Sequence, residues 1–188
     1  MTARVVGSLF ITATAAGVVS AATQGTTRGL CVFLMALAIA FIAPTLFPVL
    51  KQHGEGAAMG YVVARTLEVV FLMTAIAPIA HVRTDELWGH ASAVYFCVSV
   101  VLLNSLLFRS RLVPRWISVW ALIAVVPYAI GAVLVLLNAT EQTQVGALFV
   151  PLAINEMVLA VWLLAKGFSA TPNAHMGEQR ESSRLATD

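Results

Sequence analysis

The sequence predicts an all-α fold, a polytopic membrane helix bundle with six transmembrane helices. The chain has 188 residues, of which 60% are hydrophobic and 11% are charged, and its mean hydropathy is +0.89. A soluble domain has about half apolar and about a quarter charged residues, so this chain is too apolar for that class. The formal charge of +2 and the two cysteines exclude a basic nucleic-acid binder and a disulfide scaffold, and we expect no nucleic-acid partner.

Five long stretches carry almost no charged residue, and a sixth is broken by one acid. Each is close to the roughly 20 residues needed to cross about 30 Å of hydrocarbon, where only helices satisfy their own backbone groups. In chain order the predicted spans are Val5–Ala22, Leu30–Leu50, Tyr61–Ala80, Ser92–Phe108, Ile117–Leu137 and Val145–Ala165. The joints between them, TQGTTRG, KQHGEGAAMG, HVRTDELWGHA, RSRLVPRW and NATEQTQ, carry turn-forming and charged residues. The membrane domain therefore covers residues 1–168, and the polar segment 169–188 is predicted to be a disordered cytoplasmic tail.

The orientation follows from the basic residues, because cytoplasmic loops carry an excess of lysine and arginine. With the N-terminus inside, eight basic residues face the cytoplasm and only Arg28 and Arg83 face outward. The eight are Arg4, Lys51, Arg109, Arg111, Arg115, Lys166, Arg180 and Arg184. We therefore expect both termini in the cytoplasm. The first span could instead be a signal peptide cleaved near Ser20 and Ala22, but its apolar run is at the long end for such a segment, which favours a retained span.

Three blocks carry a resemblance to a known family: LFPVLKQHGEGAAMGYVVARTLEVVF, RSRLVPRWISVWALI and PLAINEMVLAVWLLAKGF. Together with the opening RVVGSLFITAT, they resemble the bacterial membrane family catalogued as domain of unknown function 4386. The resemblance runs from about Arg4 to Phe168 and implies a six-span protein of the bacterial cytoplasmic membrane, with the first span retained. It implies no activity. The chain departs from the family pattern in two short joints and in a second span with no acid near its start, where members often carry one.

Charged side chains within predicted spans need an explanation, because each costs at least a few kcal/mol in hydrocarbon. Arg65 and Glu68 lie three residues apart on one face of the third span and can pair, and Glu156 lies in the sixth span. Asn104 and Asn155 add amides in the fourth and sixth spans. By helix rise, Arg65, Glu68, Asn104 and Glu156 fall between the inner boundary and the midplane. We predict one intramembrane polar site, which is either a structural clamp or a site for a proton or polar ligand, with Glu156 the strongest functional candidate.

Aromatic and basic residues at the inner boundary predict membrane-interface anchors. These are Arg109, Arg111, Arg115, Trp116, Trp120 and Trp162. The segment from His81 to His90 holds the one cluster of metal-ligand residue types, but its pattern favours a solvated loop, so we predict no metal site and no cofactor.

No catalytic signature is present, so the chain is predicted to be non-enzymatic, with a structural, accessory or sensory role. Two alternatives stay open: a small proton-coupled carrier or permease that uses Glu156, and an intramembrane enzyme acting on a lipid-soluble substrate. The lipid bilayer is the expected partner. Six short spans bury a limited interior, which also leaves room for a homo-oligomer or a membrane partner protein.

Overall fold

The computed structural model describes residues 1–74, 84–137, 139 and 142–169, and it confirms the all-α prediction. The described ranges contain α-helices and one short 3-10 helix and no strand. The elements are α1 (Thr2–Ala22), α2 (Gly25–Leu50), η1 (Lys51–His53), α3 (Glu55–Thr74), α4 (Thr84–Ser110), α5 (Arg115–Leu136) and α6 (Gln142–Ala165). Six of these helices are long and apolar enough to cross a membrane, so the chain is a multi-pass membrane protein. The end of the predicted third span, 75–80, and the tail from 170 lie outside the described residues.

Tight connections, one at each end of the bundle, explain where the helices stop. Between α1 and α2 the chain turns through Thr23 and Gln24, and Gly25 begins α2 with a φ of 62°, which glycine adopts without steric cost. Between α4 and α5, Arg111 takes a φ of 56° and Pro114 precedes the first residue of α5. Proline fixes its own φ and keeps the preceding residue out of the helical region, so α5 begins only after it.

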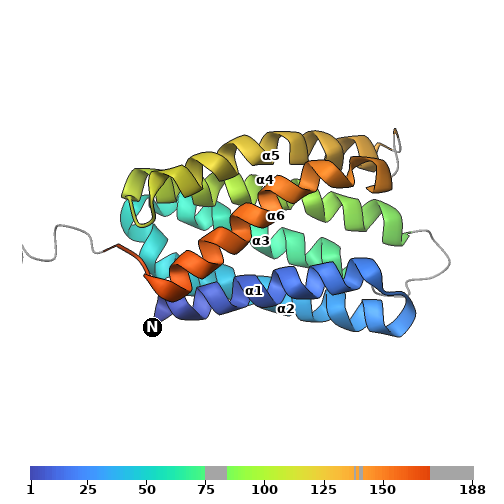
Figure 1. Ribbon diagram of the computed structural model, residues 1–188, viewed down its shortest axis with the longest axis horizontal. Coiled ribbons are helices and arrows are strands. Elements are labelled where there is room, and N and C mark those ends of the chain that lie inside the picture. The colour runs from blue at the N-terminus through green and yellow to red at the C-terminus, as the bar shows by residue number, and fades with distance from the viewer. Residues whose placement is uncertain (75–83, 138, 140–141, 170–188) are drawn as a thin grey trace, which may run out of the picture.

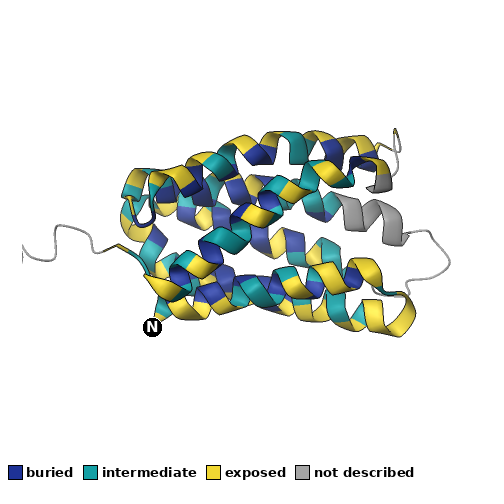
Figure 2. Ribbon diagram, viewed as in Figure 1, coloured by how far each residue is buried: buried dark blue, intermediate teal, exposed yellow. Residues whose placement is uncertain are grey.

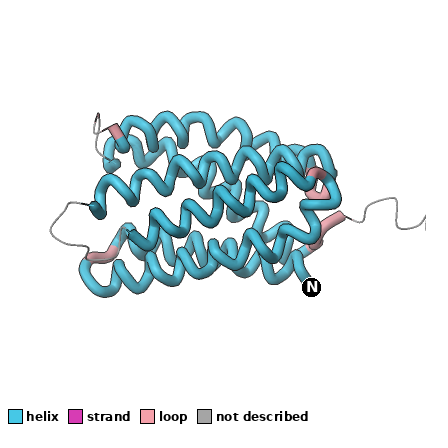
Figure 3. Tube along the Cα trace, turned by 180° about the vertical axis from the view of Figure 1, so that it is seen from behind, coloured by secondary structure: helices cyan, strands magenta, loops and turns pink. Residues whose placement is uncertain are grey.

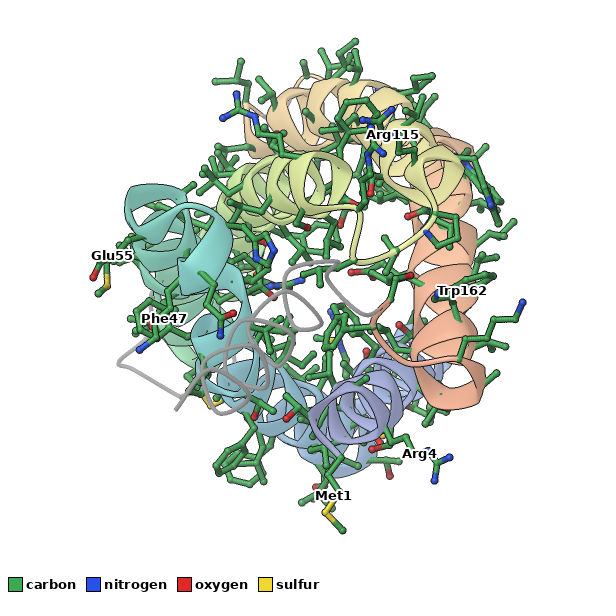
Figure 4. The ribbon with its side chains drawn as sticks, turned by 90° about the vertical axis from the view of Figure 1, so that its left-hand side faces the viewer. Met1, Arg4, Phe47, Glu55, Arg115 and Trp162 are labelled. Carbon is green, nitrogen blue, oxygen red and sulfur yellow. The ribbon has the colours of Figure 1, made fainter. Side chains whose placement is uncertain are left out.

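The six helices form a closed ring. Each helix packs against the next in the chain, and α6 packs against α1 to complete the circle. Figure 1 shows the antiparallel helices from the side, Figure 3 shows the same arrangement from behind, and Figure 4 looks down the ring. In Figure 1, α6 crosses the others obliquely, from α1 at one end toward α5 at the other.

One end of the ring holds the N-terminus and the end of α6, and we call it the terminal end (Figure 1). It is formed by Thr2, Leu50, Glu55, Ser110, Arg115 and Ala165. After α6 the chain docks on the α4–α5 connection, where the Ser169 backbone N–H donates to the Leu112 carbonyl at 2.9 Å. Six of the eight described lysines and arginines lie at this end: Arg4, Lys51, Arg109, Arg111, Arg115 and Lys166. Arg28 lies at the other end, and Arg65 lies in the interior.

The apolar core is continuous at the terminal end and divides toward the opposite end. The main cluster draws on all six helices and includes Val6, Leu50, Tyr61 and Leu163. Farther along, one small cluster around Ala121 joins α4, α5 and α6, and another around Ile39 joins α1 and α2. Large apolar side chains cover the outside of the ring, such as Leu30 and Ile123, which are 65% and 66% exposed. Figure 2 shows these exposed positions on the outward faces, as expected of a surface that contacts lipid.

The ring closes where α1 and α6 approach closely at Gly7. A Cβ atom on Gly7 would lie 2.8 Å from the Ala160 carbonyl oxygen and 2.9 Å from Cγ of Leu164. A small residue at this position lets the two backbones touch, as is common between helices in membranes. Gly7 therefore sets the spacing of the contact that completes the ring.

The Gly7→Val substitution is expected to destabilise the bundle by about 1–3 kcal/mol, because the added atoms overlap a backbone carbonyl that cannot move alone. The measurement is unfolding by SDS in mixed micelles, followed by tryptophan fluorescence. Gly56→Ala is the control, since a Cβ at Gly56 meets no atom within 4 Å. Equal stability of the two variants would contradict the close contact between α1 and α6.

Candidate functional site

Arg65 of α3 lies inside the ring and is 2% exposed. Its Nη1 donates to both carboxylate oxygens of Glu68, at 3.2 Å to Oε1 and 3.0 Å to Oε2. The two residues are three positions apart on one helix, so their side chains share a face. The pairing that the sequence predicted within the third span is present in the structure.

Arg65 also reaches the opposite side of the ring. Its Nη2 lies 3.7 Å from Oε1 of Glu156 on α6, within ion-pair distance. The helices α3 and α6 do not pack as neighbours, so the arginine side chain spans the interior to make this contact. We call Arg65, Glu68 and Glu156 the Arg65 cluster. Within it, the side chains of Arg65 and Glu68 are 3% and 7% exposed, whereas that of Glu156 is 19% exposed.

Three aromatic rings surround the Arg65 guanidinium. Its Cζ lies 5.2 Å from the centroid of Phe96 on α4, 5.7 Å from that of Tyr61 on α3, and 6.0 Å from that of Phe10 on α1. Rings at this distance attract a cation through their negative faces. The sequence analysis did not identify these three residues. Tyr61 precedes Arg65 by four positions and so lies on the same helix face, which is a usable signal, but Phe10 and Phe96 are brought in only by the packing of the ring.

The two predicted amides have different roles. The Asn155 side-chain amide of α6 donates from Nδ2 to the Ile117 carbonyl of α5 at 2.9 Å, which ties two neighbouring helices together. Asn104 is buried on α4, and its Nδ2 donates to the Val100 carbonyl of its own helix at 2.9 Å. Within the described residues, no hydrogen bond or ion pair joins Asn104 to the Arg65 cluster.

The predicted interface residues lie at the terminal end. Trp116 is 53% exposed and stacks on Trp120 with a centroid separation of 6.3 Å. Arg109 and Arg111 are exposed, and Arg115 lies 5.0 Å from the Phe108 ring and is labelled at the rim in Figure 4. Trp162 differs from the other two tryptophans, because it packs against the main core cluster while Lys166 lies 4.7 Å from its ring centroid.

The cluster can carry charge and hydrogen bonds, and its side chains are two carboxylates and one guanidinium. Two carboxylates face one guanidinium, which leaves a formal charge of −1 when all three groups are ionised. Among the described side chains, no group of three or more histidine, cysteine, aspartate or glutamate residues could hold a metal ion. The expectation of a solvated loop from His81 to His90 was wrong for residues 84–90, which begin α4, and the side chains from His81 to His90 lie outside the described residues.

Residues 3–84 and 82–167 match the family described as "Domain of unknown function (DUF4386)". The two segments together run from the first turn of α1 past the end of α6, and therefore contain the whole Arg65 cluster. Neither the curated proteins nor the solved structures include a match to the chain.

We expect Glu68→Gln to destabilise the bundle by about 1–3 kcal/mol, because it removes the carboxylate that makes both short contacts to a buried arginine. Glu156→Gln should cost less than about 1 kcal/mol, since Arg65 keeps Glu68 and the excess negative charge is removed. Both are measured by SDS unfolding in mixed micelles. The reverse order of the two effects would contradict the assignment of Glu68 as the main partner of Arg65.

Proposed function

The chain belongs to the DUF4386 family, and from this premise we propose that it is a non-enzymatic membrane protein with a structural, accessory or sensory role, in which the Arg65 cluster holds the ring together. The proposal rests on the number of helices that the Arg65 side chain contacts. Arg65 contacts Glu68 and Tyr61 on its own helix, and it contacts one residue on each of three other helices, α1, α4 and α6.

The energetic case for a clamp is the cost of an unpaired charge in a low-dielectric interior. An arginine placed there without partners would lose its hydration with no compensation, so partner groups on different helices are held to it. The contact between Arg65 and Glu156 is the ion pair that links α6 to α3 across the interior. Two adjacent residues then hold α6 on two sides: Asn155 ties it to α5, and Glu156 ties it to α3.

A non-enzymatic role is supported by the side chains around the cluster. Acid–base and nucleophilic catalysis most often use histidine beside a nucleophile. His53 in η1 is the one histidine whose side chain the structure describes, and its Nδ1 lies 3.2 Å from the Val49 carbonyl.

For location, we propose the bacterial cytoplasmic membrane with both termini in the cytoplasm. The gathering of the described basic residues at the terminal end supports this orientation, because lysine and arginine are retained on the cytoplasmic side. The lipid bilayer is then the partner of the apolar outer surface, and a homo-oligomer or a partner protein would bind within that same surface.

A second candidate function, a proton-coupled carrier or permease, is favoured by one feature of Glu156. This carboxylate is the more exposed of the two, and its single contact with Arg65, at 3.7 Å, is longer than either contact of Glu68. A second acid for one arginine leaves a group that can take up or release a proton during transport.

Proteoliposomes distinguish the two functions. The clamp predicts that proton flux across liposomes containing the protein equals that of protein-free liposomes, and that Glu156→Gln changes nothing. The carrier predicts a flux that Glu156→Gln abolishes and that Glu55→Gln, an exposed acid at the start of α3, leaves intact. Flux that depends on Glu156 would replace the clamp with the carrier, and flux that survives Glu156→Gln would contradict the assignment of that residue.

A further inference from the structure

Several buried polar atoms inside the ring have no hydrogen-bond partner among the described residues. They are Tyr61 Oη, Arg65 Nε, Arg65 Nη2, Asn104 Oδ1, Ser118 Oγ and Trp162 Nε1. Tyr61 and Ser118 are 0% exposed, Arg65 is 2% exposed and Asn104 is 3% exposed. Burying such a group without a partner costs about 1–3 kcal/mol each, so a set of this size is not left bare in a stable fold.

Three of these atoms lie together in the interior: Tyr61 Oη, Arg65 Nε and Arg65 Nη2. Glu156 pairs with Arg65, whose guanidinium lies beside the Tyr61 ring. We call Tyr61, Arg65 and Glu156 the polar layer, which joins α3 to α6.

The chemistry of the polar layer selects its ligand. Arg65 Nε and Arg65 Nη2 donate, the Glu156 carboxylate accepts, and the Tyr61 hydroxyl does either. An anion would suit the arginine, but the two carboxylates already leave the cluster with a formal charge of −1 and repel it. A cation would also be unsuitable, because the positive ends of the unpartnered N–H groups would repel it. A small neutral molecule that both donates and accepts fits the whole set.

We propose that the polar layer binds internal water molecules, which bridge Arg65 to Glu156 and satisfy the Tyr61 hydroxyl. Buried waters typically make about three hydrogen bonds to polar groups that would otherwise lack partners. Here they would also solvate the excess carboxylate charge, which a dry interior does not tolerate. This inference goes beyond the clamp and does not depend on it, because water occupies the layer whether or not the cluster limits stability.

Radiolytic footprinting tests the proposal, because hydroxyl radicals formed from bound water label adjacent side chains even where bulk solvent does not reach. The intact protein in detergent is exposed to X-ray pulses in H2(18)O after a long equilibration, and labelled peptides are identified by mass spectrometry. Each rate is divided by that of the same residue in SDS-unfolded protein. We expect Tyr61 to be labelled strongly, and the equally buried Leu46 and Leu50 of α2 to stay unlabelled. Trp162 is only partly buried and serves as the labelled reference. Protection of Tyr61 equal to that of the two leucines would overturn the proposal.

The Tyr61→Phe variant is the matched control, because it removes one hydroxyl and keeps the ring. Labelling of the ring at position 61 should then be lost, while Trp162 keeps its label and the unfolding midpoint confirms an intact fold. Unchanged labelling at position 61 in the folded variant would contradict a water bound at Oη. A bound organic molecule, detected by native mass spectrometry and displaced by the same substitution, would also overturn water as the ligand.

Discussion

The fold depends on how one arginine is accommodated inside a membrane-spanning ring. A guanidinium cannot lose its charge in a protein and is costly in hydrocarbon, so it must have partners wherever it is buried. Arg65 meets this constraint with a carboxylate on its own helix, a carboxylate on α6 and aromatic rings on α1, α3 and α4. The single apolar core of the terminal end divides beyond this level into two smaller clusters. The Arg65 cluster therefore lies at the level where the apolar core divides.

Helix packing and the polar contacts support each other at α6. This helix crosses the ring obliquely, so it contacts α1 at the terminal end and runs toward α5 at the other (Figure 1). Gly7 permits the close contact with α1, and the Asn155 amide fixes α6 against α5. Glu156 then lies in the interior, opposite Arg65, although α3 and α6 are not neighbours in the ring. The partial exposure of Glu156 follows from this position and is the feature that a carrier would use.

The sequence predicted the parts of the molecule that depend on local periodicity. All six helices follow from hydrophobic length, and the contact between Arg65 and Glu68 follows from a spacing of three on one helix. The contact with Glu156 could be expected only if the third and sixth spans faced each other, and sequence spacing does not say which helices do so. Phe10 and Phe96 could not be identified at all, since apolar residues are common in every span and only the closed ring brings these two to the guanidinium. Asn104 was placed in the same polar site because of its depth in the membrane. Its amide instead donates a hydrogen bond within its own helix.

The central claim is that Arg65 and Glu156 interact across the ring, and a double-mutant cycle measures that interaction directly. The free energy of unfolding is measured for the parent protein, Arg65→Met, Glu156→Gln and the double variant. The structure predicts that Glu156→Gln stabilises the Arg65→Met protein by removing an unbalanced carboxylate, which gives a coupling of about 0.5–3 kcal/mol. Additive effects, with a coupling near zero, would contradict the contact and with it the account of how α6 is held.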